Sequence, residues 1–363
     1  MENELVAVTK RLIKFKTITG NGLESRRAMN YVKKYLSQLH LREYTNGGFE
    51  SLVFCNKKFS DGDTFDLILH GHIDVVVAAS EDQFQPYIKE GNLYGRGALD
   101  MKGGLAALMV YMKHHLKQTD DKKVALFITS DEEIGGQNGT QYLMETMRFK
   151  GSFFITAEGE KEYYLKTEQK GVYMFKLMAS GKSDHSAYVW KGKNAIVELF
   201  NAYSKIESRF KKKRDDRNHW YTTINMGTIH GGLMRSSIPD KAEAECDIRF
   251  CGTSTNEQTV EGVITSAIKS KKNISFKKLF SAPQMKTKNT DPYLRSLNAS
   301  AKKQLHISHD LFFKNHGTND ARFAAKQGIP AVGFGPVGDN YHVKDEYVSI
   351  KSLVDFYSIL EKI

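Results

Sequence analysis

Cysteine is scarce in this chain, and it contains no Cys-x-x-Cys pair. Among 363 residues only Cys55, Cys246 and Cys251 carry a thiol. A zinc module built on thiolates needs closely spaced cysteine pairs, and secreted domains held by disulfides need more cysteines than these. The scarcity argues against structural zinc on thiolates and predicts a reducing compartment, which we take to be the cytoplasm.

Long apolar runs are also missing. The first residues, Met-Glu-Asn-Glu-Leu, lack the basic and apolar regions of a secretion signal. No apolar run approaches the ~20 residues of a membrane-spanning helix. We therefore expect a soluble protein without a membrane partner, long enough for two domains with proper cores.

Acidic residues are fewer than basic ones, 42 against 53, which gives a formal net charge of +11. Basic patches neutralise phosphates, so nucleic acid has to be considered as a partner. The densest basic run, Lys211 to Arg214, is followed at once by Asp215 and Asp216, and no basic run is interleaved with aromatics or set in a nucleic-acid motif. We interpret the excess as solvated surface and predict no nucleic-acid partner, although the charge can concentrate anionic substrates.

What the chain does contain is a set of apolar runs that end in histidines or acids. The run Leu67–Val76 places His70, His72 and Asp74 on one face of a strand, because side chains alternate along a strand. A liganding histidine normally donates its second ring N–H to a carboxylate, and Asp74 could serve His72 in this way. His70 and His72 could also form a metal pair, or His70 could be a core residue with its hydrogen bonds satisfied.

Three further apolar runs end in the same way. They are the run from Val124 into Asp131, Glu132 and Glu133, the run from Ser152 into Glu158, and the run from Ala331 toward His342. In open α/β sheets ligands bind outside the carboxyl ends of the strands, so these side chains should meet in one crevice. Asp100 lies in a glycine-rich turn before an apolar helix expected over Leu105–Leu116, and it is either a fifth carboxylate of this crevice or the N-cap of the helix.

Such a collection of histidines and acids can bind metal. Zinc is bound by His nitrogens and carboxylate oxygens, and catalytic zinc sites keep a position open for water. Two metals ~3.5–4 Å apart can share a carboxylate and promote hydrolysis together. Of the neighbours Glu132 and Glu133, one could then act as a base and the other as a ligand. The alternative for this acidic segment is an exposed loop or the first turn of a helix.

The order of the expected elements indicates an α/β fold in two domains. Up to Glu158 strands and helices alternate, as in a mainly parallel sheet flanked by helices. After Gly171 the expected order is β-α-β-β-α-β, which is the order of a ferredoxin-like module that could be inserted. We therefore expect a discontinuous first domain over 1–170 and 283–363, and a second domain over 171–282.

Together these motifs resemble those of one enzyme family. The segments His72–Asp74, Gly95–Gly104 and Ser130–Glu133 and the late His342 are similar to the motifs of the co-catalytic zinc aminoacylase, carboxypeptidase, acetylornithine deacetylase and succinyl-diaminopimelate desuccinylase family, in order along the whole chain. The resemblance implies two zinc ions, for which cobalt or manganese could substitute. The implied ligands are Asp100 as the bridge, His72 and Glu158 for one ion, and Glu133 and His342 for the other. It also implies Glu132 as the general base, Asp74 as the residue that orients His72, and a cis peptide bond after Asp100.

The resemblance continues into the second domain, which would be a lid or dimerisation domain. It implies that His185 steadies the oxyanion, that Arg249 holds a substrate carboxylate, and that Thr318, in a segment similar to the desuccinylase branch, touches the substrate. A solvated histidine and an arginine on a sheet surface are the alternatives. Members of this family commonly pair through this domain, so we expect a homodimer in which His185 reaches the partner's site.

Departures from the family leave the substrate open. Asn319 stands where the desuccinylase branch usually has serine, Ser236 and Ser237 replace the asparagine before Ile-Pro, and Gly159 replaces a proline after Glu158. The expected reaction is hydrolysis of the amide bond of a small, carboxylate-bearing N-acyl amino acid. A dipeptidase or carboxypeptidase of the same family is the alternative, and a non-catalytic basic binding protein on this scaffold is a more remote one.

Overall fold

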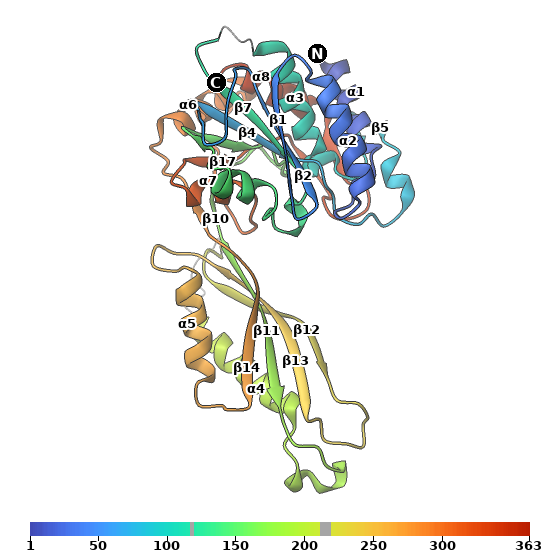
Figure 1. Ribbon diagram of the computed structural model, residues 1–363, viewed down its shortest axis with the longest axis vertical. Helices are drawn as coiled ribbons and strands as arrows, with labels where there is room; N and C mark the ends of the chain where they lie inside the picture. The colour runs from blue at the N-terminus through green and yellow to red at the C-terminus, as the bar shows by residue number, and fades with distance from the viewer. Residues whose placement is uncertain (117–119, 211–218) are drawn as a thin grey trace. The chain divides into compact units, whose positions relative to one another are not determined.

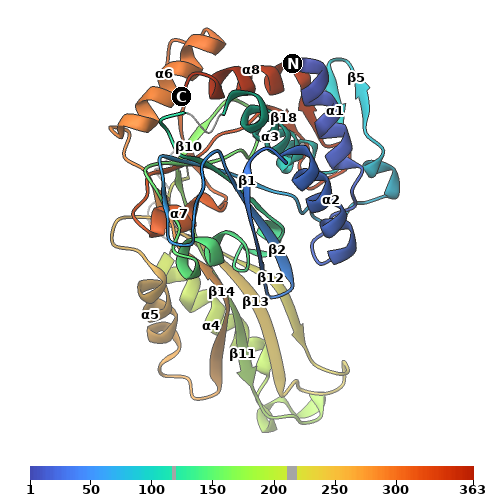
Figure 2. The same ribbon diagram turned by 45° about the horizontal axis from the view of Figure 1, so that its top comes forward.

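The computed structural model describes residues 1–116, 120–210 and 219–363, which form two compact units (Figures 1 and 2). The first unit comprises Met1–Glu168, Met285–Phe313 and Asn319–Ile363, and the second comprises Gln169–Gln284 and Lys314–Thr318. The segment Lys314–Thr318, expected in the first domain, is thus grouped with the second unit, where the backbone N–H of Lys170 donates to the carbonyl of Asn315. The basic run that we interpreted as solvated surface, Lys211 to Arg214, lies outside the described residues.

A sheet of nine strands forms the centre of the first unit. Its strands are β1 (His40–Asn46), β2 (Phe49–Cys55), β4 (Leu67–His72), β7 (Val124–Thr129), β9 (Phe154–Thr156), β10 (Leu165–Gln169), β15 (Met285–Lys286), β16 (Phe312–Asn315) and β17 (Ala331–Gly333). They are ordered β1-β2-β7-β4-β9-β17-β10-β15, and β16 pairs with β10. The four strands that carry the predicted site, β7, β4, β9 and β17, are therefore neighbours, and they are parallel to one another.

The prediction of a mainly parallel sheet is correct only for these four strands. Strand β2 is antiparallel to both β1 and β7, and β10 is antiparallel to β17. The reason at one edge is local, because only two residues, Gly47 and Gly48, connect β1 to β2, and a connection this short can join only antiparallel strands. The sheet is mixed, with a parallel centre and antiparallel edges.

Helices cover both faces of this sheet (Figure 1). They are α1 (Glu2–Ile13), α2 (Gly22–Tyr35), α3 (Gly103–His115), α6 (Pro292–Leu305), α7 (Ala321–Lys326) and α8 (Ile350–Leu360). Leu69 of β4 belongs to a core that it shares with α1, α2, α3, α6 and α8, whereas its neighbour Ile68 belongs to a second core that it shares with α7. The central strands β4, β7 and β9 are buried along their whole length, because consecutive side chains enter cores on opposite faces.

Two smaller sheets complete the first unit. One has the strand order β18-β19-β6-β5, and the other pairs β3 (Thr64–Phe65) with β8 (Lys150–Gly151). The strands of the first are β5 (Tyr87–Lys89), β6 (Asn92–Tyr94), β18 (Gly338–Asp339) and β19 (Tyr347–Ser349). The antiparallel pairing of β19 with β6 brings the segment before Asp100 beside the segment after His342, although they are distant in the sequence.

The second unit has the order β-α-β-β-α-β that the sequence predicts. Its elements are β11 (Gly171–Ser180), α4 (Ala195–Phe210), β12 (Thr223–Gly231), β13 (Lys241–Phe250), α5 (Glu257–Ile268) and β14 (Ile274–Ala282). The sheet has the order β12-β13-β11-β14, with every neighbouring pair antiparallel. Both helices pack against it in one apolar core, which makes this unit ferredoxin-like.

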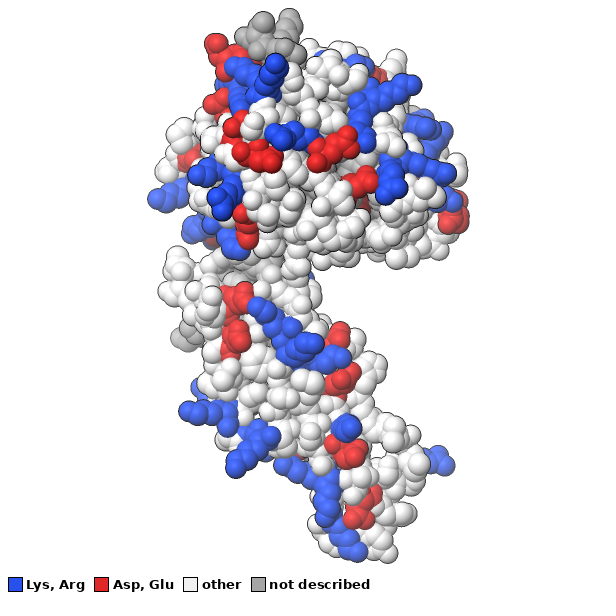
Figure 3. Space-filling view, in the orientation of Figure 1, with Lys and Arg blue, Asp and Glu red and all other residues white. Residues whose placement is uncertain are grey.

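Basic side chains are spread over the surface of both units, with acids between them on the face shown in Figure 3. Lys176 of β11, for example, lies 3.0 Å from Glu243 and 3.6 Å from Glu245 of the neighbouring strand. Among the described helices, none is both long and apolar enough to cross a membrane. The absence of a nucleic-acid partner stays a prediction.

Candidate metal centre

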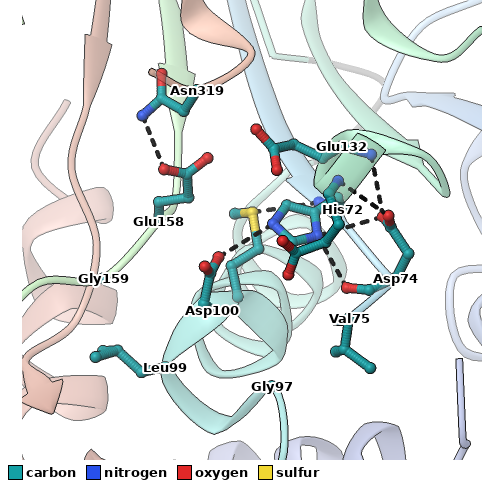
Figure 4. Close-up of polar contacts among 12 residues, drawn as sticks. His72, Asp74, Val75, Gly97, Leu99, Asp100, Glu132, Glu158, Gly159 and Asn319 are labelled. Atoms are coloured by element: carbon teal, nitrogen blue, oxygen red, sulfur yellow. Dashed lines mark hydrogen bonds and ion pairs between the residues drawn. The ribbon is translucent and has the colours of Figure 1, made fainter. Parts of the chain in front are cut away.

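The parallel strands deliver the predicted ligands to one edge of the large sheet (Figure 4). His72 is the last residue of β4, Glu132 and Glu133 follow β7, and Glu158 follows β9. Gly104, in the first turn of α3, is close to the chain after β9, because a Cβ built at this position would lie 1.9 Å from the carbonyl oxygen of Ala157. This close approach needs glycine, and it brings the start of α3, with Asp100 just before it, against the segment that carries Glu158.

Asp100 joins the two predicted histidine ligands. Its Oδ1 lies 3.2 Å from Nε2 of His72, and its Oδ2 lies 3.1 Å from Nε2 of His342. The same nitrogen of His342 is 3.2 Å from Oε2 of Glu133. One carboxylate thus uses each of its oxygens toward a different histidine, which is the arrangement that a bridging ligand requires. The peptide bond after Asp100 is cis, as the resemblance implies.

The turn that carries Asp100 is held by an acid that the sequence analysis did not identify, Glu346. Its Oε1 accepts hydrogen bonds from the backbone N–H groups of Leu99, at 3.0 Å, and Asp100, at 3.1 Å. Its Oε2 accepts from the Arg96 guanidinium and from the backbone N–H of Gly97, both at 2.8 Å. Glu346 and Arg96 are buried, so this pair fixes the turn from inside the protein. Nothing in the local sequence indicated a contact between residues so far apart.

Asp74 orients His72 and also the two neighbouring glutamates. Nδ1 of His72 donates to the backbone carbonyl of Asp74 at 3.0 Å and lies 3.4 Å from its Oδ1. This contact leaves Nε2 of His72 directed toward Asp100. The Asp74 carboxylate also accepts from the backbone N–H groups of Glu132, at 3.3 Å, and Glu133, at 3.1 Å. The predicted orienting role is consistent with this geometry, which ties the end of β4 to the turn after β7.

Two buried carboxylate oxygens in this cluster have no hydrogen-bond partner, Oε1 of Glu133 and Oε1 of Glu158. Buried polar atoms without partners are rare, and a cation is one of the groups that can satisfy them. Ligand atoms of His72, Asp100 and Glu133 lie within 4.8 Å of one another, and so do those of His72, Glu132 and Glu158. Nitrogen and carboxylate oxygen donors suit zinc, so the residues present fit the metals that the resemblance implies.

The electrostatics of the cluster also favour bound cations. Burial and the neighbouring Glu158 raise the pKa of Glu132 well above its usual value, and burial and Asp100 raise the pKa of Glu158 to about 7. Hydrogen bonds that the His342 ring donates to Asp100 and Glu133 raise the pKa of His342 to about 10. The negative charges of the acids repel one another, which raises the pKa of Glu132 and of Glu158. The same charges stabilise a protonated histidine, which raises its pKa. A divalent cation would relieve the same repulsion by replacing the protons.

His70 does not belong to the cluster. Its Nδ1 lies 2.9 Å from the hydroxyl of Thr156, and its Nε2 lies 3.0 Å from the hydroxyl of Thr140. Burial, with the nearby charge of His72, lowers the pKa of His70 well below its usual value, so the ring is neutral. Of the two alternatives, the core residue with satisfied hydrogen bonds is correct, and the metal pair of His70 with His72 is wrong.

Arg322 is a buried arginine next to Glu132 that was not predicted as a site residue from the sequence, although the nearby residue Thr318 was. The guanidinium of Arg322 donates to the carbonyl of Gly135 at 2.9 Å and lies 3.5 Å from Asp320 and 3.9 Å from Oε1 of Glu132. A cation inside the protein is normally paired with an acid. Arg322 therefore supports the turn that carries Glu132.

The remaining predicted site residues, His185, Arg249 and Thr318, belong to the second unit. His185 is exposed, and its Nδ1 accepts a hydrogen bond from the backbone N–H of Ala187 at 3.1 Å. The Arg249 guanidinium pairs with Asp247, two residues away on β13, at 2.9 Å. Their contacts with substrate stay predictions.

Comparison with known proteins gives consistent matches along the chain. Residues 68–363 match the family described as "Peptidase family M20/M25/M40". A protein of Nautilia profundicola named succinyl-diaminopimelate desuccinylase is 29% identical over 97% of this chain and 97% of its own. A Helicobacter pylori protein of the same name is 31% identical, over 81% of this chain and 77% of its own.

Solved structures share the fold. An M20 family metallo-carboxypeptidase from Sulfolobus solfataricus has a TM-score of 0.81 at 19% identity, covering 99% of this chain and 98% of its own. A tripeptidase from Staphylococcus aureus has a TM-score of 0.78 at 22% identity, covering 100% of this chain and 98% of its own. These likenesses confirm the α/β fold predicted from the sequence.

Proposed function

The chain belongs to peptidase family M20/M25/M40 and is a metal-dependent hydrolase, and from this premise we propose that it removes the acyl group from a small N-acyl amino acid. The observation that carries the proposal is Asp100, whose two oxygens lie against His72 and His342 beside buried carboxylate oxygens that have no other partner. A deacylase is favoured over a peptidase because the relatives that are 29% and 31% identical are named desuccinylases, whereas the peptidases are similar at 22% or less.

In this proposal two zinc ions, or cobalt or manganese in their place, are bound by five residues of the first unit. Asp100, His72 and Glu158 would hold one ion, and Asp100, Glu133 and His342 would hold the other. Metals bound there would polarise the amide carbonyl and lower the pKa of a water molecule. Four of the ligands, His72, Asp100, Glu133 and Glu158, come from strand ends and from a turn held by Glu346, so they are positioned before any substrate arrives, whereas His342 lies in the loop between β18 and β19.

Glu132 would take the proton from the attacking water and return it to the departing nitrogen. Distance alone does not separate it from the ligands, because Glu132 also lies within ligand distance of His72 and Glu158. The contacts of the two neighbours do differ. Glu133 shares His342 with Asp100, whereas Oε1 of Glu132 lies 3.9 Å from the Arg322 guanidinium. This difference supports Glu133 as the ligand and Glu132 as the base.

Substrate contacts would come from the second unit. We propose that His185 donates to the oxyanion of the tetrahedral intermediate, that Arg249 pairs with the substrate carboxylate, and that Thr318 contacts the substrate. An arginine is suited to this role because its fork of N–H groups matches a carboxylate. Asp247 now occupies that fork, so substrate would have to compete with it or bind to the donors that it leaves.

We further propose that the chain is a homodimer formed through the second unit. Among the described strands, β12 pairs only with β13, so one edge of its sheet is open to another strand. Large apolar side chains are exposed on the same unit, including Phe200 of α4, Trp190 of the short 3₁₀ helix Ser186–Lys191, and Leu233 in a loop. Sedimentation analysis across a range of protein concentrations tests this, and a monomer throughout would contradict it.

The test of function is steady-state hydrolysis with added zinc or cobalt. The panel should contain N-succinyl-diaminopimelate, N-acetylornithine, other N-acyl amino acids and dipeptides. We expect hydrolysis of an N-acyl amino acid, with loss of activity on chelation and return when metal is added. Preferential hydrolysis of dipeptides would favour the alternative, a dipeptidase or carboxypeptidase. No hydrolysis by zinc-loaded protein would contradict the proposed enzyme and favour a binding protein.

A further inference from the structure

The side chain of Asn319 has a fixed orientation beside the metal centre. Its Oδ1 accepts a hydrogen bond from the backbone N–H of Ala321, at 3.2 Å, at the start of α7. Its Nδ2 donates to Oε2 of Glu158 at 2.9 Å (Figure 4). Because the oxygen is engaged by a backbone donor, the NH₂ group is the end that faces the glutamate. Asn319 is fully buried, so water does not compete for either contact.

The space for this amide depends on Gly333 of β17. A Cβ built on Gly333 would lie 2.8 Å from Nδ2 of Asn319, closer than such atoms approach in proteins. Any larger residue at this position would therefore force the amide of Asn319 or the strand to shift. The donor and its space come from separate segments, the turn before α7 and the strand beside β9.

The contact with Asn319 involves only one of the two carboxylate oxygens of Glu158 and leaves the other available to a cation. Oε2 is held by Asn319, whereas Oε1 is buried without a hydrogen-bond partner. The same glutamate has its pKa raised by burial and by the charge of Asp100, so the two carboxylates repel each other. The hydrogen bond from Asn319 to Oε2 opposes rotation of Glu158 away from Asp100.

We infer that Asn319 is a positioning residue that fixes Glu158 with Oε1 directed to a cation, and that it sets the affinity of the metal site formed with His72. The inference rests on the proposed function, which supplies the metal. Partners that hold a ligand in place typically contribute 10–100-fold to metal affinity. The desuccinylase motif that this segment resembles has serine at this position, and a serine hydroxyl does not extend as far from the backbone as an asparagine amide. The asparagine therefore gives this chain a directed donor at the metal site.

The first test is zinc titration of metal-free Asn319→Ser protein against a chromophoric chelator. We expect the affinity of one zinc site to fall roughly 10–100-fold and the other to stay near the wild-type value. Asn315→Ser is the matched control. Oδ1 of Asn315 accepts from the backbone N–H of Gly317 at 3.1 Å, which is the same local turn without a glutamate contact. This control should bind zinc like the wild type.

The second test displaces the Asn319 amide by a substitution on β17, at Gly333. Gly333→Ala should displace Nδ2 of Asn319 and weaken the same zinc site, while in the Asn319→Ser background the added methyl group no longer meets an amide. The two effects should therefore be non-additive. Consequences common to both backgrounds, such as the 3.2 Å approach of the methyl group to the Lys166 side chain, cancel in this double-mutant cycle.

Three results would overturn the inference. They are wild-type zinc affinity in folded Asn319→Ser protein, additive effects in the cycle, and equal weakening of both zinc sites. Circular dichroism and thermal unfolding establish that each variant is folded, and Gly333→Ala supplies the answer if Asn319→Ser is not. Because zinc is the only ligand, the result is independent of substrate. Selective weakening of one zinc site would support the inference even if the protein hydrolysed none of the test amides.

Discussion

Replacing Glu346 should weaken both the first unit and its metal centre. In Glu346→Gln the shape is kept, but one oxygen becomes an NH₂ group facing two donors, either Arg96 and Gly97 or Leu99 and Asp100. The buried Arg96 guanidinium also loses its charge partner. Removing one partner of a buried ion pair typically destabilises a protein by about 3–5 kcal/mol. At about 2–4 °C per kcal/mol for a domain of this size, the melting temperature of the first unit should fall by roughly 6–20 °C.

Thermal unfolding by calorimetry, with zinc content measured on the same samples, checks both parts of this prediction. Glu43→Gln is a suitable control, since Glu43 is half-exposed and lies 3.0 Å from Lys33 at the surface. An exposed pair contributes about 0–1 kcal/mol, so this variant should melt within a few degrees of the wild type. Glu346→Gln protein that melts like the control and binds zinc like the wild type would refute the reasoning that this acid holds the Asp100 turn.

Four further predictions concern the centre itself. Glu132→Ala should abolish turnover with near wild-type metal content, whereas Glu133→Ala should also weaken one metal site, and swapped phenotypes in metal analysis would reverse the two roles. Zinc binding should release protons and become tighter as the pH rises from 6 to 8, because His342, with a pKa of about 10, must lose its proton to bind metal. Calorimetry in buffers of different ionisation enthalpy measures the protons released, and an affinity that does not depend on pH would contradict this prediction. Arg322→Lys should keep both metals but lower kcat about 10–100-fold through a misplaced Glu132, and unchanged kcat would remove its supporting role. Co-expressed Glu132→Ala and His185→Ala chains should regain activity as heterodimers if His185 acts in the partner's site, and purified heterodimers without activity would show that it does not.

The parts of the fold that the sequence predicts are those with local patterns. The four parallel strands of the site are apolar runs followed by polar residues, α3 is the apolar helix expected after the glycine-rich turn, and the second unit has the expected order of elements. The same patterns, with the family motifs, led to His72, Asp100, Glu133 and His342 as a group, and the structure brings them together. Family membership, predicted from these motifs, is confirmed by the match over residues 68–363.

The parts that were missed depend on contacts between distant segments. Glu346 binds the backbone of Asp100 across 246 positions, and Asn319 reaches Glu158 across 161. A single acid or amide has no periodicity that could reveal its partner, so these residues are found only when the fold is known. The antiparallel pairing of β2 with β7 and of β10 with β17 was missed for a related reason, because the residues of a strand do not specify the direction of a neighbour that is distant in the sequence.

The pairing of β19 with β6 has a consequence for how the protein is made. The chain emerges from the ribosome in order, so His72, Asp100 and Glu158 are synthesised long before His342 and Glu346. Until β19 exists, the Asp100 turn lacks the carboxylate that holds it, and one of its two histidines is missing. During most of translation, the nascent chain would therefore expose only part of the proposed ligand set to cations in solution. With the ligands proposed above, the metal site would be complete only when the segment from His342 to β19 has folded back onto the segment that carries Asp100.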